Sequence, residues 1–199
     1  MSRIFLEGGG DSKELRVRCR EGFRKLLERC DYAGKMPRLV SSGGRTTVFD
    51  DFEKAHGENS STPEYIAVLL DSEDPVDDIE KTWEHLRKRD NLRKPQNSND
   101  EQVLFMTTCM ETWIVCDRGS LQQHYGSQLQ VNALPSLIDL EKRSRQDILD
   151  KLVHATRNCS KAYSKGERSF QILGDLDPAE LREYLPSFVR LRRILDAVL

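Results

Sequence analysis

Acidic residues stand directly after three apolar segments of the chain, where they could take part in metal chemistry. Glu7 follows the first segment, Asp71 the third and Glu111 the fourth. Glu73 lies two positions after Asp71, so in an extended chain it points to the same side, and Asp74 could replace it if the chain turns. Carboxylates repel one another, and a hard, oxygen-seeking cation is the usual reason for gathering them. The pattern therefore indicates a site for Mg²⁺ or Mn²⁺.

A divalent cation held in this way is suited to phosphate chemistry. It stabilises the charge that builds up on a phosphodiester and can activate a water molecule. A carboxylate that is not committed to the metal can act as general acid or base. We therefore expect Glu7, Asp71 and Glu73 to be catalytic and metal-binding, and we expect Asp74 and Glu111 to be further ligands. The alternative for Glu111 is a structural role in the first turn of the next helix, where an acid meets the helix dipole.

Several basic residues could contact a phosphate group. Arg45 follows a Gly-Gly pair between a strand and a helix, where bare backbone amides also favour an anion, although an ordinary turn fits the same residues. Lys165 lies in a Tyr-Ser-Lys-Gly turn and could neutralise a phosphate, the alternative being an exposed turn lysine. A basic cluster near the end of the chain is expected on the solvated flank of the last helix, with nucleic-acid contact as the alternative: Arg190, Arg192 and Arg193.

Four apolar runs must position these side chains. They predict strands over Arg3–Leu6, Arg38–Ser41, Tyr65–Leu70 and Val103–Met110. The third run is uninterrupted, which is typical of a strand covered on both faces in a parallel sheet. Ligands bind at the carboxyl ends of the strands in an open parallel sheet, so we expect the acids that follow the strands to converge there.

Apolar residues at helical spacing predict the segments that cover this sheet. The predicted helices are one capped by Asp11 or Ser12 and running to Cys30, one over Thr47–Ala55, one from Pro75 past Leu86, one over Thr112–Asp117, one over Arg143–Arg157, one starting near Pro178 and a last one through Val198. The fold class is therefore α/β, with a mostly parallel four-stranded sheet flanked by helices. Residues 1–117 form the α/β core, and residues 118–199 form a helical extension packed on it.

Composition and charge narrow the class of protein. The 199 residues are 37% hydrophobic and 32% charged, with a net charge of −2. No apolar run approaches the ~18–20 residues needed to span a bilayer, so we expect no association with a membrane. Five cysteines without a CxxC pair indicate reduced thiols and a cytoplasmic location. Eleven acids between Asp50 and Glu80, against one base, indicate a cation site or an acidic surface and do not indicate a broad face that coats nucleic acid.

Five short segments resemble motifs of the Toprim fold, which is found in topoisomerases, primases and the OLD-family nucleases. The first strand with Glu7–Asp11 (EGGGD) looks like the EGxxD opening of that fold, and Asp71–Glu73 (DSE) lies where its DxD motif should fall. Met110–Asp117 (METWIVCD) resembles the E-x-W-l-l-a-D block of a small Toprim-like family. Tyr163–Lys165 and Pro186–Phe188 fit the tail of that family, so the resemblance spans nearly the whole chain.

The resemblance implies a Toprim-like core that binds Mg²⁺ through Glu7, Asp71 and an acid of the second motif. That acid is Glu73 in place of the usual aspartate, or Asp74 beside it. Similar proteins are partners of AAA- or ABC-type ATPases in bacterial defence against phage. We therefore expect a cytoplasmic, metal-dependent nuclease that acts on DNA or RNA as the toxic effector of such a system, and that could form a homo-oligomer.

Two other functions fit the same residues. The imperfect Asp-x-Glu motif and the near-neutral charge also suit a non-catalytic module that docks on the partner ATPase through its acidic edge and helical tail. A nucleotidyl- or phosphoryl-transfer enzyme could use the same acids. Binding of Mg²⁺ or Mn²⁺ distinguishes the docking module from the enzymes.

Overall fold

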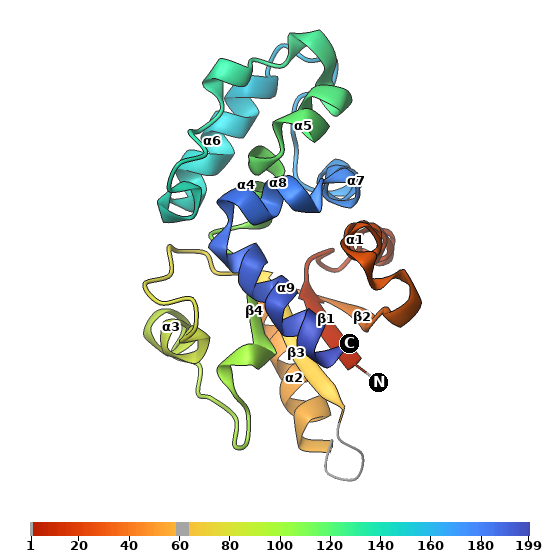
Figure 1. The fold of residues 1–199 in the computed structure, drawn as a ribbon, viewed down its shortest axis with the longest axis vertical. Coiled ribbons are helices and arrows are strands. Elements are labelled where there is room, and N and C mark those ends of the chain that lie inside the picture. Colours follow the sequence, from red (N-terminus) through yellow and green to blue (C-terminus); the bar gives the residue numbers. More distant parts are fainter. Residues whose placement is uncertain (1, 59–63) are drawn as a thin grey trace.

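The apolar runs predicted as strands form one sheet in the computed structural model, which describes residues 2–58 and 64–199. The strands are β1 (Ser2–Glu7), β2 (Arg38–Gly43), β3 (Tyr65–Asp71) and β4 (Val103–Met106). Their order across the sheet is β2-β1-β3-β4, and the three strand pairings are all parallel (Figure 1). The predicted α/β class, a four-stranded parallel sheet flanked by helices, is confirmed.

Helices fill the connections between these strands and make up most of the chain after β4. They are α1 (Lys13–Leu27), α2 (Arg45–Glu58), α3 (Thr82–Asp90), α4 (Met110–Cys116), α5 (Arg118–Tyr125), α6 (Arg145–Thr156), α7 (Glu167–Asp175), α8 (Pro178–Tyr184) and α9 (Pro186–Val198). A π-helical turn (Glu28–Tyr32) extends α1, and short 3₁₀ turns occur at Ala33–Lys35, Asp100–Gln102, Gly126–Gln128, Val131–Ala133 and Leu140–Lys142.

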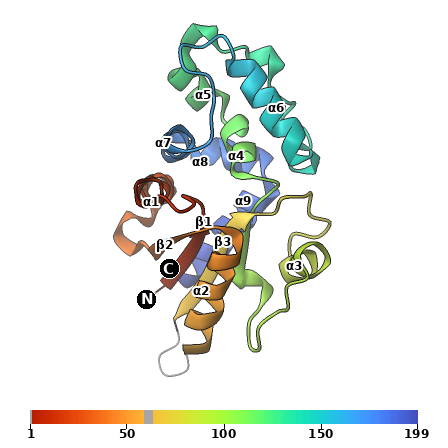
Figure 2. The ribbon, with the colours of Figure 1, turned by 180° about the vertical axis from the view of Figure 1, so that it is seen from behind.

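The two faces of the sheet are covered by different helices. Side chains alternate along each strand, so Phe5 joins α2 and α3 in one hydrophobic cluster, while its neighbours Ile4 and Leu6 join α1, α4 and α9 in the other. α9 crosses β4 on one face (Figure 1), and α2 lies on the opposite face (Figure 2). Burial on both faces explains why the run that forms β3 is apolar without interruption.

Helix α1 begins and packs as its sequence predicts. The Ser12 side chain accepts the backbone N–H of Leu15 (3.3 Å) and so caps the first turn. Phe23 and Leu26, on the predicted apolar stripe, are buried in the cluster under the sheet. Full burial of a side chain of this size stabilises the fold by about 1.5–3 kcal/mol.

Helix α1 also joins the sheet to the chain after residue 117. Its Gly22 lies against α7, where an added Cβ would be 2.5 Å from the carbonyl oxygen of Phe170. The cluster that contains the α1 side chains also contains Leu173 of α7 and Ile194 of α9. One hydrophobic core therefore serves both segments, and the division of the chain at residue 117 stays a prediction.

The predicted fourth strand is wrong in its extent. The run Val103–Met110 was expected to be one strand ending at Glu111, but β4 ends at Met106 and α4 begins at Met110. The reason is a contact with the neighbouring strand, because Asp71 at the end of β3 accepts the backbone N–H of Met110 (2.8 Å) and satisfies the start of a helix. Glu111 therefore lies in the first turn of α4.

The helix predicted from Pro75 is also wrong in its start, since α3 begins at Thr82. A distant side chain fixes this start, because Asp100 accepts the backbone N–H of Trp83 (2.9 Å). Val76 still packs against the core, but it does so from an irregular segment. Apolar residues at helical spacing before Thr82 therefore did not form a helix, because an irregular segment also partly buries them.

Two helices and a buried arginine were not predicted. α5 occupies part of the polar stretch 119–133, which has no clear pattern of apolar residues, and α7 follows the turn at residues 163–166. Arg190, expected on a solvated flank, is only 3% exposed and donates to the Val103 carbonyl (2.9 Å). Among the described helices, none combines the length and the apolarity that crossing a membrane requires.

Candidate active site

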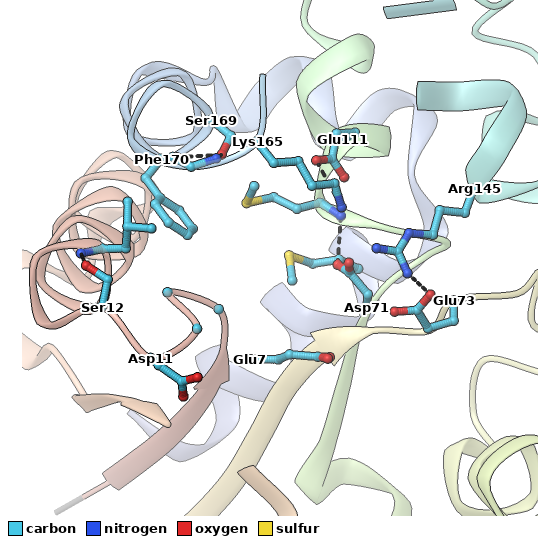
Figure 3. A pocket seen from close by; sticks show the side chains of 17 residues that line it. Glu7, Asp11, Ser12, Asp71, Glu73, Glu111, Arg145, Lys165, Ser169 and Phe170 are labelled. Atoms are coloured by element: carbon cyan, nitrogen blue, oxygen red, sulfur yellow. Dashed lines mark hydrogen bonds and ion pairs between the residues drawn. The ribbon is translucent and has the colours of Figure 1, made fainter. Parts of the chain in front are cut away.

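A pocket of about 420 Å³ lies at the carboxyl edge of the sheet. Residues that end or follow β1, β3 and β4 line it together with residues of α1, α4, α6 and α7 (Figure 3). Its charged lining residues are Glu7, Asp11, Asp71, Glu73, Glu111, Arg145 and Lys165. Four of the five predicted metal ligands therefore share one pocket, as parallel strands that end at one edge allow.

Glu7 ends β1 and is paired with Arg45 of α2. Arg45 Nη1 lies 3.2 Å from Glu7 Oε2, and the same guanidinium donates to the Asp71 carbonyl (2.8 Å) and to the Asp90 carboxylate (2.7 Å). Burial raises the pKa of Glu7, and the charge of Arg45 offsets part of that rise. Arg45 is not among the residues that line the pocket. Its side chain ties the ends of β1 and β3 together.

Asp71 ends β3 among other carboxylates. Its Oδ1 accepts the backbone N–H of Met110 (2.8 Å). Burial raises the pKa of Asp71 to about 7; the charges of Glu111 and Glu7 add to the rise, and Lys165 offsets part of it. Near neutral pH the Asp71 carboxyl group is therefore protonated in part of the molecules and ionised in the rest. A cation beside it would favour the ionised form.

Glu111 is fully buried in the first turn of α4. Its Oε1 accepts the hydroxyl of Tyr163 (2.6 Å) and lies 3.4 Å from Lys165 Nζ. Burial and the charge of Glu111 raise the pKa of Tyr163, so this hydroxyl stays protonated and donates. Glu111 Oε2 is also buried and has no hydrogen-bond partner in the part of the chain that the structure describes. Burying an unpartnered carboxylate oxygen is costly, so a bound cation or donor would be favoured there.

The two acids that follow Asp71 differ in their placement. Glu73 has left-handed backbone (φ 69°), and its carboxylate is paired with Arg145 of α6 inside the pocket (Figure 3). Asp74 does not line the pocket; its side chain is 66% exposed and its carboxylate lies 3.0 Å from Arg89 Nε. The chain does turn after β3, and the turn directs Asp74 toward solvent.

Arg145 and Tyr163 belong to this site although no role at it was predicted for them. Arg145 is the first residue of α6, directly after its N-cap Ser144, and nothing in its local sequence points to a pocket. The Tyr-Ser-Lys tail motif drew attention to the right segment, but the contact of Tyr163 with Glu111 depends on the fold. Lys165, the predicted phosphate contact from the same motif, does line the pocket, and its side chain is 46% exposed.

The glycine run after β1 forms one side of the cavity. Gly9 has φ +83°, and an added Cβ there would lie 2.7 Å from backbone atoms of Arg16. Only glycine lets the chain pass this close to α1. Asp11, at the end of the run, projects into solvent. The run therefore borders the cavity with backbone and leaves room for a ligand beside Glu7.

The carboxylates do not form a complete metal cage. Within residues 2–58 and 64–199, no three His, Cys, Asp or Glu side chains are grouped so that they could hold a metal ion, and arginines are paired with Glu7 and Glu73. Mg²⁺, however, commonly takes one or two carboxylates and completes its shell with water and substrate phosphate. Asp71 and Glu111 fit such a partial site, because the protein leaves the charge of each partly uncompensated.

Fold and pocket together define an α/β protein with a mixed acidic and basic pocket at the carboxyl edge of a parallel sheet. The chain belongs to the family described as a domain of unknown function (DUF4276), whose model matches residues 6–196. That span includes every residue that lines the pocket. A comparison with the curated proteins found no match, and a comparison with the solved structures found none either.

Proposed function

We propose that this pocket binds Mg²⁺ or Mn²⁺ together with a phosphodiester of nucleic acid and hydrolyses that ester. One observation carries the proposal: a single lining offers incompletely compensated carboxylates, Asp71 and Glu111, beside cationic side chains, Arg145 and Lys165. Carboxylates for a divalent cation and basic groups for phosphate oxygens are recurring parts of metal-dependent phosphate chemistry.

The acids divide into ligands and a proton acceptor. Asp71 and Glu111 would hold the cation, which when bound neutralises charge on the phosphate and makes a water ligand more acidic. Glu7 lies at the same edge of the sheet, and its raised pKa suits it to accept the proton of the attacking water. Arg45 would position Glu7 through their ion pair.

The basic residues would bind and activate the phosphate. A guanidinium can give two parallel hydrogen bonds to phosphate oxygens, which suits Arg145. Because Arg145 is paired with Glu73, its transfer to phosphate would release Glu73 to act as a further metal ligand. In the reaction the water oxygen bonds to phosphorus, the ester P–O bond breaks, and Lys165 supplies a proton to the leaving oxygen.

The wider setting follows from the resemblance to Toprim proteins. That resemblance supports a nucleic-acid substrate, an AAA- or ABC-type ATPase as partner, and a role as the effector of a defence system against phage. Five free cysteines suit the reducing cytoplasm.

A non-catalytic docking module is the second candidate. Two acids of the pocket, Glu7 and Glu73, are already neutralised by arginines, as in a purely structural ion-pair network. In that case the pocket would need no metal, and the acidic edge would contact the partner ATPase.

Cleavage of fluorescently labelled oligonucleotides tests the proposed function. Single-stranded and duplex DNA and RNA are incubated with the protein in EDTA, in millimolar Mg²⁺ and in millimolar Mn²⁺. We expect cleavage only with metal. We expect Asp71→Asn and Glu111→Gln to lower the rate by about 10²–10³-fold, because each removes a charge that stabilises the reacting centre while keeping the shape of the side chain.

Asp77→Asn is the matched control, because Asp77 is an aspartate 93% exposed and outside this pocket. Its rate should equal that of the wild type. Full activity in folded Glu111→Gln would contradict the proposal. Calorimetric titration then separates the two candidates, since no binding of Mg²⁺ or Mn²⁺ at millimolar concentration, with an intact ATPase complex, would favour the docking module.

A further inference from the structure

The pocket has two unlike walls. One carries the charged side chains described above together with Met106 from the end of β4 and Met110 from α4, and the other is apolar, with Leu15 from α1 and Phe170 from α7. Figure 3 shows Phe170 on the opposite side of the cavity from Arg145. Metal binding and phosphate binding make no use of the apolar wall, so it requires a separate explanation.

The apolar wall is preformed. Phe170 is held in place because α7 lies on Gly22 of α1 with no room for a Cβ between them. The glycine run closes on the same ring, since an added Cβ at Gly8 would lie 3.5 Å from Phe170 Cζ. Phe170 is 7% exposed, so its ring presents part of its surface to the cavity, and the half-buried Leu15 extends this apolar surface. Such a surface favours contact with a flat ring.

The size of the cavity limits what can enter. Its volume of about 420 Å³ is at the lower end of the ~300–1,000 Å³ typical of small-molecule pockets. Such a space holds one nucleotide and excludes a stacked, base-paired duplex. A nucleotide also matches the two walls, because it joins a flat heterocycle to a phosphate through a sugar.

We propose that the apolar wall binds the base of one unpaired nucleotide while its phosphate lies against Arg145 and Lys165. The substrate is therefore a single-stranded segment or a strand end, recognised by contact of its base with the apolar wall of Leu15 and Phe170. This inference rests on the proposed function for its phosphate contacts. Its central claim, recognition of a base, is a claim about binding and does not require that cleavage occurs.

Calorimetric titration with two small ligands tests the inference. Adenosine 5′-monophosphate and ribose 5-phosphate share sugar and phosphate and differ in the base. With the full chain in Mg²⁺ buffer, we expect the nucleotide to bind about tenfold more tightly, the order of magnitude of one stacked base. Equal affinities, or no detectable binding of either ligand, would overturn the inference.

Two variants locate the effect on the apolar wall. Phe170→Leu keeps an apolar side chain at this position and removes the ring, and Leu15→Ala trims a half-buried residue of the same wall. Both variants should bind adenosine 5′-monophosphate severalfold more weakly than the wild type does. Their affinity for ribose 5-phosphate should be unchanged, which also shows that the variants are folded. A variant that weakens both ligands equally would contradict stacking at this wall.

The oligonucleotide assay separates this inference from the proposed function. Faster cleavage of single strands than of duplexes supports both. Equal cleavage rates on single strands and duplexes would support the proposed nuclease activity and contradict the inference that the substrate is an unpaired nucleotide. Binding that depends on the base, without cleavage in either Mg²⁺ or Mn²⁺, would contradict the proposed nuclease activity and support the inferred nucleotide site.

Discussion

The two edges of the sheet differ in how completely their buried charged groups are hydrogen-bonded. At the amino edge, Arg190 is almost completely buried, yet each nitrogen of its guanidinium has a partner: the carbonyls of Val103 (2.9 Å) and Asp100 (2.7 Å) and the carboxylate of Glu80 (3.1 Å). At the carboxyl edge, Glu111 keeps a buried oxygen without a partner among the described residues. Stability alone explains the first arrangement and opposes the second.

Folding therefore accounts for the amino edge, whereas the unpartnered oxygen at the carboxyl edge costs stability. A buried charge with a complete set of hydrogen bonds is expensive to disturb and needs no ligand. A carboxylate whose pKa is raised by burial and by the charges of neighbouring carboxylates, as at Asp71, indicates a site that favours a bound positive group.

Arg190→Met should destabilise the protein by about 3–5 kcal/mol, because it leaves a set of buried acceptors without their donor. Urea unfolding measures the change. Arg193→Met is the matched control, since Arg193 belongs to the same helix and also contacts Glu80 but is 51% exposed. It should cost less than about 1 kcal/mol. Similar losses in the two variants would break the contrast at the amino edge.

Asp71→Asn should have the opposite sign and stabilise the protein by about 1–3 kcal/mol at pH 8. The folded state raises the pKa of Asp71 from 3.8 to about 7, so it holds this proton more tightly than the unfolded chain does. The free energy of unfolding therefore falls as the pH rises through this window, and the loss is complete above it.

The asparagine variant removes this titration, so its advantage over the wild type should shrink toward zero as the pH approaches 4. Urea unfolding at several pH values gives the curve. A variant less stable than the wild type at pH 8 would show that the Asp71 carboxylate is compensated in the folded protein.

Added Mg²⁺ should have the smallest effect. At roughly ten times its dissociation constant it should raise the free energy of unfolding by about 1.4 kcal/mol. Thermal unfolding with and without the ion detects this as an upward shift in Tm. Arg193→Met, which changes the other edge, should show the same shift, whereas Asp71→Asn should show little or none. An equal shift in both variants would place the metal elsewhere.

The parts of the fold that could be predicted from sequence are those decided by local apolarity. Uninterrupted runs such as Tyr65–Leu70 identified the strands, and parallel pairing then brought Glu7 and Asp71 to one edge. The end of β4 could not be predicted in this way, because its position depends on a hydrogen bond from Met110 to Asp71, which is 39 residues distant.

The basic half of the site illustrates the same limit. Arg145 begins a helix as many arginines do, and only the docking of α6 brings it to Glu73. Arg190 is different, because a usable signal existed. It falls three residues after Ser187 and four before Ile194, on the helical stripe that is buried, so its spacing indicated burial although its charge suggested solvent.

The close packing of α1 against α7 at Gly22 also has a temporal consequence. Ribosomes synthesise the strands of the sheet before α6 and α7, so a nascent chain can present Glu7 and Asp71 while Arg145, Lys165 and the Phe170 ring have yet to be made. The acidic edge of the sheet is thus translated before the segments that carry the basic and aromatic side chains of the pocket. A complete pocket exists only once elongation has passed α7, because residues of α6, of α7 and of the segment before α7 are part of its lining.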